Sequence, residues 1–265
     1  MIKFFRTIRL KLINRNSPSS ASGRFSRYLI YAIGEIILVV IGILIALQIN
    51  TWNEQKKQRA EEISTLRNIR TDFINAIIEF EENNAFREEI ISKTSSLYTL
   101  IRDEQINYTK QRIDSLIAGL LINPTYNGQS ETLNILFNSG KINIISNDSI
   151  KNALVLWPQQ VADITEDEVY SSNALYNMVL PVVRQYVALY DVYRSIDYRG
   201  YALFQSQSPS PFESDYAGLL KDPDFESSLT TRELTISVSL LQSRELIETA
   251  QEIINMIDAE INKSE

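Results

Sequence analysis

The feature that most constrains this chain is an apolar run close to its first residue. Residues 28–52 read YLIYAIGEIILVVIGILIALQINTW and contain one charged side chain, Glu35. At about 1.5 Å per helical residue, about 20 residues cross a hydrocarbon layer of about 30 Å, and residues 29–49 supply that length. The run predicts a transmembrane helix over 28–50, with Tyr28, Tyr31 and Trp52 as aromatic anchors at the membrane interfaces.

Two other interpretations fit this run less well. A buried helix of a soluble protein would need protein on all sides, because the run has no polar face. A cleaved signal peptide usually has an apolar core of about 7–15 residues followed by a small-x-small cleavage site. This run is longer and ends in ALQIN, without that pattern. An uncleaved signal anchor is therefore expected.

Charge is distributed unevenly along the chain. Residues 1–27 hold seven cations and no acid, so all 33 acidic residues lie in the remainder with the other 19 cations. The seven cations are Lys3, Arg6, Arg9, Lys11, Arg15, Arg24 and Arg27. The positive-inside rule predicts a basic cytoplasmic tail over 1–27 and a domain over 51–265 on the other side of the membrane. The basic tail attracts membrane lipid, and the acidic remainder argues against nucleic-acid binding.

Glu35 is the one ionisable side chain within the predicted span. Helical spacing from Glu35 puts Leu38, Gly42, Ala46 and Ile49 on one face. Small residues let transmembrane helices approach closely, so this face predicts contact with another transmembrane helix. Alternatively, Glu35 reaches interfacial water, because it lies about two turns from the cytoplasmic edge, and then has no role in contact or chemistry.

Beyond the span, the pattern of apolar residues is helical. Spacings of three and four predict an amphipathic helix carrying Ile63, Leu66, Ile69, Phe73, Ile77 and Phe80. No Gly or Pro occurs between residues 43 and 118, so the membrane helix is expected to continue as a long stalk to about Arg102. The fold class predicted is all-α, with this stalk followed by an antiparallel helical bundle.

Capping and breaking residues divide the rest of the chain. Helices are expected over 113–121 and 130–137, with Ser130 as an N-terminal cap and Gly140 in a left-handed C-terminal cap. Residues 141–145 are expected to form a short extended link before a helix capped by Ser146 or Asn147. Pro158 and Pro181 are expected to kink or break their helices, and Asp222-Pro223 to start a long terminal helix. Residues 205–212 are expected to form a surface loop.

The composition argues against most catalytic chemistry. There is no cysteine and no histidine, which excludes disulfides, thiolate metal sites and imidazole mechanisms. The chain has no phosphate-binding GxxxxGK[ST] loop, no GxSxG elbow and no SxxK. We therefore predict a protein that is not an enzyme, with no catalytic, cofactor-binding or metal-binding residue and no cofactor.

Two residue clusters have both a plain and a functional interpretation. The acidic groups at 79–89 and 163–168 lack the alternating oxygen ligands of a cation loop, and are interpreted as solvated helix faces. The tyrosine-rich run over 170–201 is interpreted as core or bundle-edge packing. A groove for a partner peptide or a glycan is the alternative for the tyrosines.

The apolar run also resembles a known signature. Residues 31–54, YAIGEIILVVIGILIALQINTWNE, are similar to an uncharacterised membrane-protein family common in Bacteroidota, and the MIKFFRTIR start and residues 139–154, SGKINIISNDSIKNAL, resemble it too. Thr51 departs from the usual INNWNE of the family. The resemblance implies an inner-membrane protein with a helical periplasmic domain, and it implies no catalytic residue.

Three functions remain in view. The leading one is a membrane-anchored interaction or scaffold protein, which binds a protein partner or itself through the transmembrane helix and the periplasmic bundle. An accessory subunit of a proton-motive-force-driven complex, with Glu35 as its protonatable group, is the alternative, because stator and energiser subunits share this layout. An extracytoplasmic ligand sensor is the third, although 27 cytoplasmic residues are too few for an output domain.

Overall fold

The computed structural model describes residues 21–103, 108–128, 130–198, 201–202 and 208–263, and only the backbone of 21–28, 197–198 and 201–202. The chain divides into two compact units, Met1–Ala60 and Glu61–Glu265. The described residues form helices, with one hairpin of two-residue strands. The prediction of an all-α protein is confirmed.

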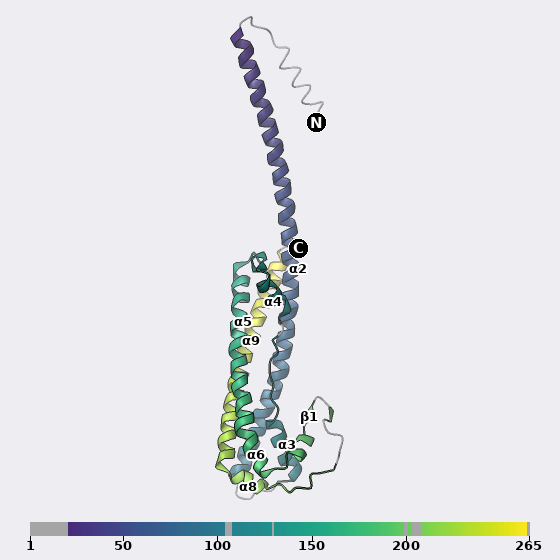
Figure 1. The fold of residues 1–265 in the computed structure, drawn as a ribbon, viewed down its shortest axis with the longest axis vertical. Coiled ribbons are helices and arrows are strands. Elements are labelled where there is room, and N and C mark those ends of the chain that lie inside the picture. Colours follow the sequence, from purple (N-terminus) through teal and green to yellow (C-terminus); the bar gives the residue numbers. More distant parts are fainter. Residues whose placement is uncertain (1–20, 104–107, 129, 199–200, 203–207, 264–265) are drawn as a thin grey trace. The chain divides into compact units, whose positions relative to one another are not determined.

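The first unit is formed by the N-terminal part of helix α2 (Ala21–Arg102), drawn in purple in Figure 1. Every described side chain from Leu29 to Gln58 is exposed. The most apolar stretch of 18 residues has a mean hydropathy of 2.7, and none of it is buried. Within the described part of the chain this is the one helix that is long and apolar enough, by length and composition, to cross a membrane.

The second unit contains the rest of α2 and the helices and two short strands that follow it. In chain order these are α3 (Lys110–Leu120), α4 (Glu131–Asn138), a 3₁₀ helix η1 (Lys141–Ile144), α5 (Asp148–Ala174), a π-helix η2 (Leu175–Val179), α6 (Leu180–Tyr186), α7 (Leu189–Arg194), β1 (Asp197–Tyr198), β2 (Tyr201–Ala202), α8 (Tyr216–Lys221) and α9 (Pro223–Asn262). The predicted helix ends at Arg102, Asn147 and Pro223 are confirmed.

Hydrogen bonds fix the directions of the three long helices. Arg70 of α2 bonds Asp258 of α9 at 2.6 Å, and Tyr98 bonds Thr230 at 3.1 Å, so α9 runs antiparallel to α2. Asn147 at the start of α5 bonds Glu260 near the end of α9 at 3.0 Å, so α5 and α9 are also antiparallel (Figure 1). Helices α2 and α5 therefore run in the same direction, and the chain between them must return along the bundle.

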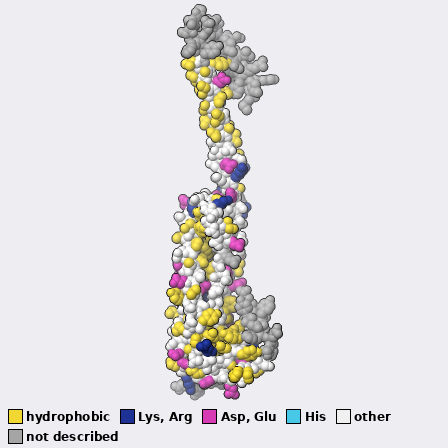
Figure 2. All heavy atoms as spheres, viewed as in Figure 1, with side chains coloured by type: hydrophobic (Ala, Val, Ile, Leu, Met, Phe, Trp, Pro, Cys, Tyr) yellow, Lys and Arg dark blue, Asp and Glu magenta, His cyan; other side chains and the backbone are white. Residues whose placement is uncertain are grey.

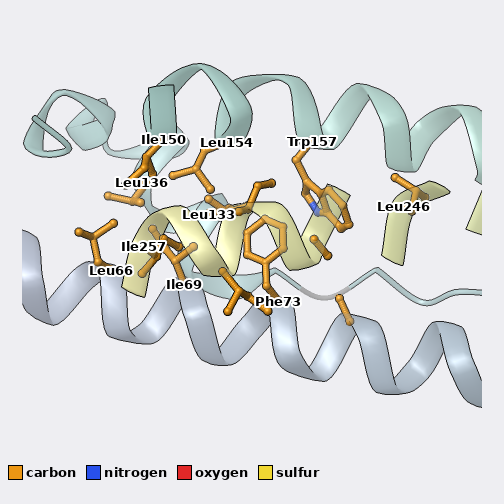
Figure 3. Close-up of a cluster of buried hydrophobic side chains, with 14 of the residues drawn as sticks. Leu66, Ile69, Phe73, Leu133, Leu136, Ile150, Leu154, Trp157, Leu246 and Ile257 are labelled. Atoms are coloured by element: carbon orange, nitrogen blue, oxygen red, sulfur yellow. The ribbon is translucent and has the colours of Figure 1, made fainter. Parts of the chain in front are cut away.

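Two apolar clusters form the core of this unit. The first lies between α2, α4, α5 and α9, where Phe73 and Trp157 have ring centroids 4.8 Å apart (Figure 3). The second lies among α2, α3, η2, α6, α8 and α9 and includes Leu97, Ile117 and Phe225. Burying one such side chain contributes about 1.5–3 kcal/mol, so these clusters supply most of the stabilisation of the bundle.

Local signals set the helix boundaries with two exceptions. The Asn147 side chain accepts hydrogen bonds from the N–H groups of Ser149 and Ile150, as an N-terminal cap should. Ser130 occupies the predicted cap position but makes no capping hydrogen bond. The predicted extended link at 141–145 is wrong, because residues Lys141–Ile144 form a 3₁₀ helix whose turn satisfies the Ile145 N–H locally.

The two prolines behave differently. Helix α5 continues through Pro158, so the predicted break is not seen there. The neighbouring Leu154 and Trp157 are buried in the first cluster, and their packing outweighs the one hydrogen bond that proline removes. Pro181 is the second residue of α6, just after the π-helix η2, where α-helical geometry is interrupted, as predicted.

Gly140 gives a direct test of the left-handed cap. Its φ is +67°, and a Cβ there would meet nothing within 4 Å, so only backbone strain opposes a side chain. We expect Gly140→Ala to lower the free energy of unfolding by about 1–2 kcal/mol. Gly140→Asn should cost less, because asparagine tolerates this conformation. Urea unfolding of the full chain in detergent measures both, and equal losses for Ala and Asn would contradict the explanation.

Candidate functional site

The sequence-predicted contact face lies on the helix of the first unit. In a regular helix Glu35, Gly42 and Ala46 share one face, and all three are exposed. A Cβ at Gly42 would meet nothing within 4 Å, so the backbone there is open to close approach. Figure 2 shows how apolar side chains cover this part of the chain. Contact with a second transmembrane helix stays a prediction.

The predicted anchors and cations are only partly described. Tyr31 and Trp52 are exposed, and the Lys56 ammonium lies 5.3 Å from the centroid of the Trp52 ring. Tyr28, Arg24 and Arg27 belong to α2, but their side chains lie outside the described residues. The described residues do not include Lys3, Arg6, Arg9, Lys11 or Arg15. The orientation across a membrane therefore stays a prediction.

The second unit has a buried polar layer between its two apolar clusters. We define this polar layer by six residues of α2, α5 and α9, which are Asn84, Arg87, Glu168, Ser171, Arg232 and Ser243. All are at most 7% exposed, and both arginines are fully buried. Burying unpaired charges is costly, so these groups must find partners inside the bundle.

An ion pair between α2 and α5 is the centre of the polar layer. The Arg87 guanidinium donates to a Glu168 carboxylate oxygen and, at 2.8 Å, to the Asn84 side-chain oxygen. The Ser243 hydroxyl of α9 donates to the same Asn84 oxygen. Burial raises the pKa of Glu168 and lowers the pKa of Arg87, because both groups are removed from water. The Arg87–Glu168 pair and the Asn84–Ser243 bond together link α2, α5 and α9 at a single level of the bundle.

The polar layer also holds the segment that returns along the bundle, residues 121–128. The Tyr126 N–H donates to both Glu168 oxygens, at 3.2 and 3.0 Å, and the Asn127 N–H donates to Glu79 at 2.8 Å. Residues 123–128 of this segment belong to no helix and no strand, so helix side chains satisfy part of their backbone. The Tyr126 ring stacks on Phe80 with centroids 4.0 Å apart, and burial raises the pKa of Tyr126 to about 12.

Arg232 of α9 has a related role one turn further along α5. It donates to the Ser171 carbonyl at 2.7 Å, to the Ser171 hydroxyl at 2.6 Å and to the Ile122 carbonyl at 2.6 Å. Burial lowers the pKa of Arg232 to about 10, so the group stays protonated at neutral pH. The Ile122 carbonyl lies just after α3, whereas the Ser171 carbonyl is inside α5 and also accepts the Leu175 N–H. Arg232 therefore joins α9 both to α5 and to the start of the returning segment.

The sequence interpretation of the 163–168 acids needs one correction. Glu168 was expected on a solvated face, and this is wrong, because its carboxylate is buried against Arg87 and the Tyr126 N–H. Glu168 shares a helical face with Leu154 and Trp157, and this spacing could have indicated that it points into the bundle. Asp163, Glu166 and Asp167 lie at exposed or half-buried positions of α5. Among the described residues, no group of three or more acids could hold a metal ion.

A second polar cluster links α3, α7 and α8. The Lys110 ammonium lies 2.6 Å from Asp191, which also accepts the Ser210 N–H at 2.8 Å, and the Tyr216 hydroxyl donates to Asp114 at 2.5 Å. Burial raises the pKa of Asp114. Burial also acts to raise the pKa of Asp191, but the bonds from Lys110 and Ser210 outweigh it and hold that pKa below its usual value.

This lowered pKa gives a test by pH. A carboxylate with a lower pKa in the folded state adds stability above its unfolded pKa, and that stability is lost as pH falls through the folded pKa. We expect Asp191→Asn to destabilise the chain at about pH 6 and to have a smaller effect at about pH 3. Urea unfolding at both pH values measures this. A cost that stays constant or grows toward low pH would contradict the assignment.

The tyrosine-rich run is split between surface and interior. Tyr170 and Tyr176 are 56% and 57% exposed, whereas Tyr186 and Tyr190 are half-buried. The latter two line an open surface pocket of about 340 Å³, together with Arg184, Phe212 and neighbours at 185–189, 210 and 213. The packing interpretation therefore describes only part of the run, and a groove for a peptide or glycan stays the untested alternative.

Together these features define an all-helical protein with one candidate membrane helix and a helical bundle that contains a buried polar layer. The model of DUF6090, a family of unknown function, matches residues 35–178, more than half of the chain, and the chain belongs to this family. The match begins at Glu35 and ends within η2. Neither the curated proteins nor the solved structures contain a match.

Proposed function

We propose that this protein is a membrane-anchored, non-enzymatic interaction or scaffold protein of the bacterial cell envelope. Helix α2 spans the inner membrane, the basic tail lies in the cytoplasm, and the second unit acts in the periplasm. The observation that carries the proposal is the uncovered apolar helix of the first unit, with Glu35, Gly42 and Ala46 on one face.

The physical argument concerns the cost of Glu35 in lipid. A charged side chain at the centre of a span costs about 2.5–3.5 kcal/mol on insertion scales, and less near the interface. A partner helix that lies against Gly42 and Ala46 can bond the Glu35 carboxyl and remove most of this cost. The described chain covers no part of this face, which supports a partner outside the fold.

The interior of the bundle also supports a binding role. Arg87, Glu168 and Arg232 bond helix side chains or the returning backbone, so their chemistry is used to hold the fold. A partner would then bind the outer surface of the second unit and the span.

Crosslinking in native lipid tests the proposal. The full chain, at expression levels near those in the cell, is expected to crosslink into a defined complex. Gly42→Leu/Ala46→Leu should reduce that complex, because bulk on this face prevents close approach, whereas Ile37→Leu/Val40→Leu on the opposite face should leave it intact. Recovery of free monomer alone would contradict the proposal.

A second candidate function uses Glu35 itself. An exposed carboxylate within the candidate span fits an accessory subunit of a proton-motive-force-driven complex. Replacing Glu35 by Gln discriminates the two functions, since a scaffold keeps both complex and phenotype. A proton relay keeps the complex but loses the phenotype.

A further inference from the structure

Helix α5 exposes an unusual amount of apolar surface. Of the 11 large apolar side chains that are exposed among the described residues of the second unit, six lie on α5 and η2. They are Val155, Leu156, Val169, Tyr170, Tyr176 and Met178. The opposite face of α5 packs Leu154, Trp157 and Ile164 into the first cluster, so the bundle does not use the outer face for its core.

The exposed residues follow a regular repeat. Val155, Ala162 and Val169 of α5 recur every seven residues, Tyr176 of η2 follows at the same spacing, and all four are exposed. We call these four residues the α5 stripe. Pro158, Thr165 and Ser172 lie between them at the intervening positions of the heptad and carry no charge. An apolar heptad on one helix is the pattern that packs against another helix.

Charges beside the α5 stripe restrict what can cover it. Asp163, Glu166 and Asp167 flank it, and none of them forms an ion pair within the described part of the chain. Residues 152–183 contain no Lys or Arg. Figure 2 shows apolar and acidic side chains side by side along the surface of this unit. The surface around the stripe is therefore both apolar and negatively charged.

This charge favours one class of partner over two others. A second copy of the chain that packed stripe against stripe would bring acids opposite acids, and an anionic membrane surface would be repelled in the same way. A helix that carries Lys or Arg beside an apolar seam is complementary to the α5 stripe in both charge and apolar surface. Resting on the proposed role as an interaction protein, we infer that the α5 stripe docks a basic amphipathic helix of a partner protein.

Site-specific photo-crosslinking with a defined peptide tests this inference. The full chain in zwitterionic lipid nanodiscs carries a photo-reactive residue at Thr165, in the middle of the stripe, or at Leu241 of α9 as a control. The probe is a synthetic helical peptide of about three heptads with Leu in the seam and Lys beside it, and the matched peptide has Glu in place of Lys. The Lys peptide is expected to crosslink at Thr165 and not at Leu241.

Two double variants separate the contributions of charge and apolar surface. Asp163→Lys/Glu166→Lys and Val155→Gln/Val169→Gln should each reduce the adduct about tenfold. Glu245→Lys/Glu248→Lys, which reverses two exposed charges on α9, should leave it unchanged. All these positions are exposed on helices and the new residues are good helix formers, so folding should be retained.

Several outcomes overturn the inference. They are equal crosslinking by the Glu peptide, equal adducts at Leu241, a dominant adduct between two copies of the chain, or no adduct. The proposed scaffold role fails by a different result, free monomer in native membranes. The two experiments can therefore fail independently.

Discussion

Replacement of Arg87 by methionine is expected to lower the free energy of unfolding of the second unit by about 3–5 kcal/mol. Methionine has a similar length, so little volume is lost, but Glu168 is left as a buried carboxylate without its cation. Urea unfolding of the full chain in mild detergent measures the loss. In a Trp52→Phe background, the fluorescence of the buried Trp157 reports the unfolding of the second unit alone.

A double variant provides the control for this prediction. Arg87→Met/Glu168→Gln removes both charges and keeps an oxygen that accepts the Tyr126 N–H, so most of the lost stability should return. A double variant as unstable as Arg87→Met alone would show that the uncompensated charge is not the cause. The polar layer would then need another explanation.

Trp157→Ala is the second substitution with a large expected effect, about 3–5 kcal/mol. The Trp157 side chain is 2% exposed and packs on the Phe73 ring, so alanine leaves a cavity between α2, α5 and α9. Circular dichroism during urea unfolding measures the loss without a tryptophan signal. Trp157→Phe should cost less, because it keeps a ring against Phe73.

The matched control for Trp157 is the other tryptophan of the chain. Trp52 is 62% exposed in the first unit, so Trp52→Ala should leave the unfolding of the second unit nearly unchanged. Similar losses for the two variants would mean that Trp157 does not pack as the first cluster shows.

Periodicity and capping chemistry predicted the long helices of the fold. The 3–4 spacing of Leu66, Ile69 and Phe73 matches the buried face of α2, and Asn147 caps α5 as its side-chain oxygen allows. These features are local, so a single sequence contains them. The terminal helix was also predicted, but two of its apolar residues, Leu234 and Leu241, are exposed.

The parts that the sequence did not predict depend on distant contacts. Residues 121–128 run along the bundle because Glu79, Glu168 and Arg232 bond their backbone, and these partners lie far apart in the chain. The same contacts place Glu168 in the interior. At the candidate site, helical spacing predicted the shared face of Glu35, Gly42 and Ala46, whereas a contact between two molecules lies beyond one chain.

The central claim is that residues 28–50 form a membrane span, and alkaline carbonate extraction of membranes that contain the untagged full chain tests it most directly. The chain is expected to remain in the membrane pellet after high-speed centrifugation. Val40→Lys/Ile41→Lys should release it, because each lysine at the centre of a span costs about 2.5–3.5 kcal/mol. Wild-type chain in the supernatant would contradict the account.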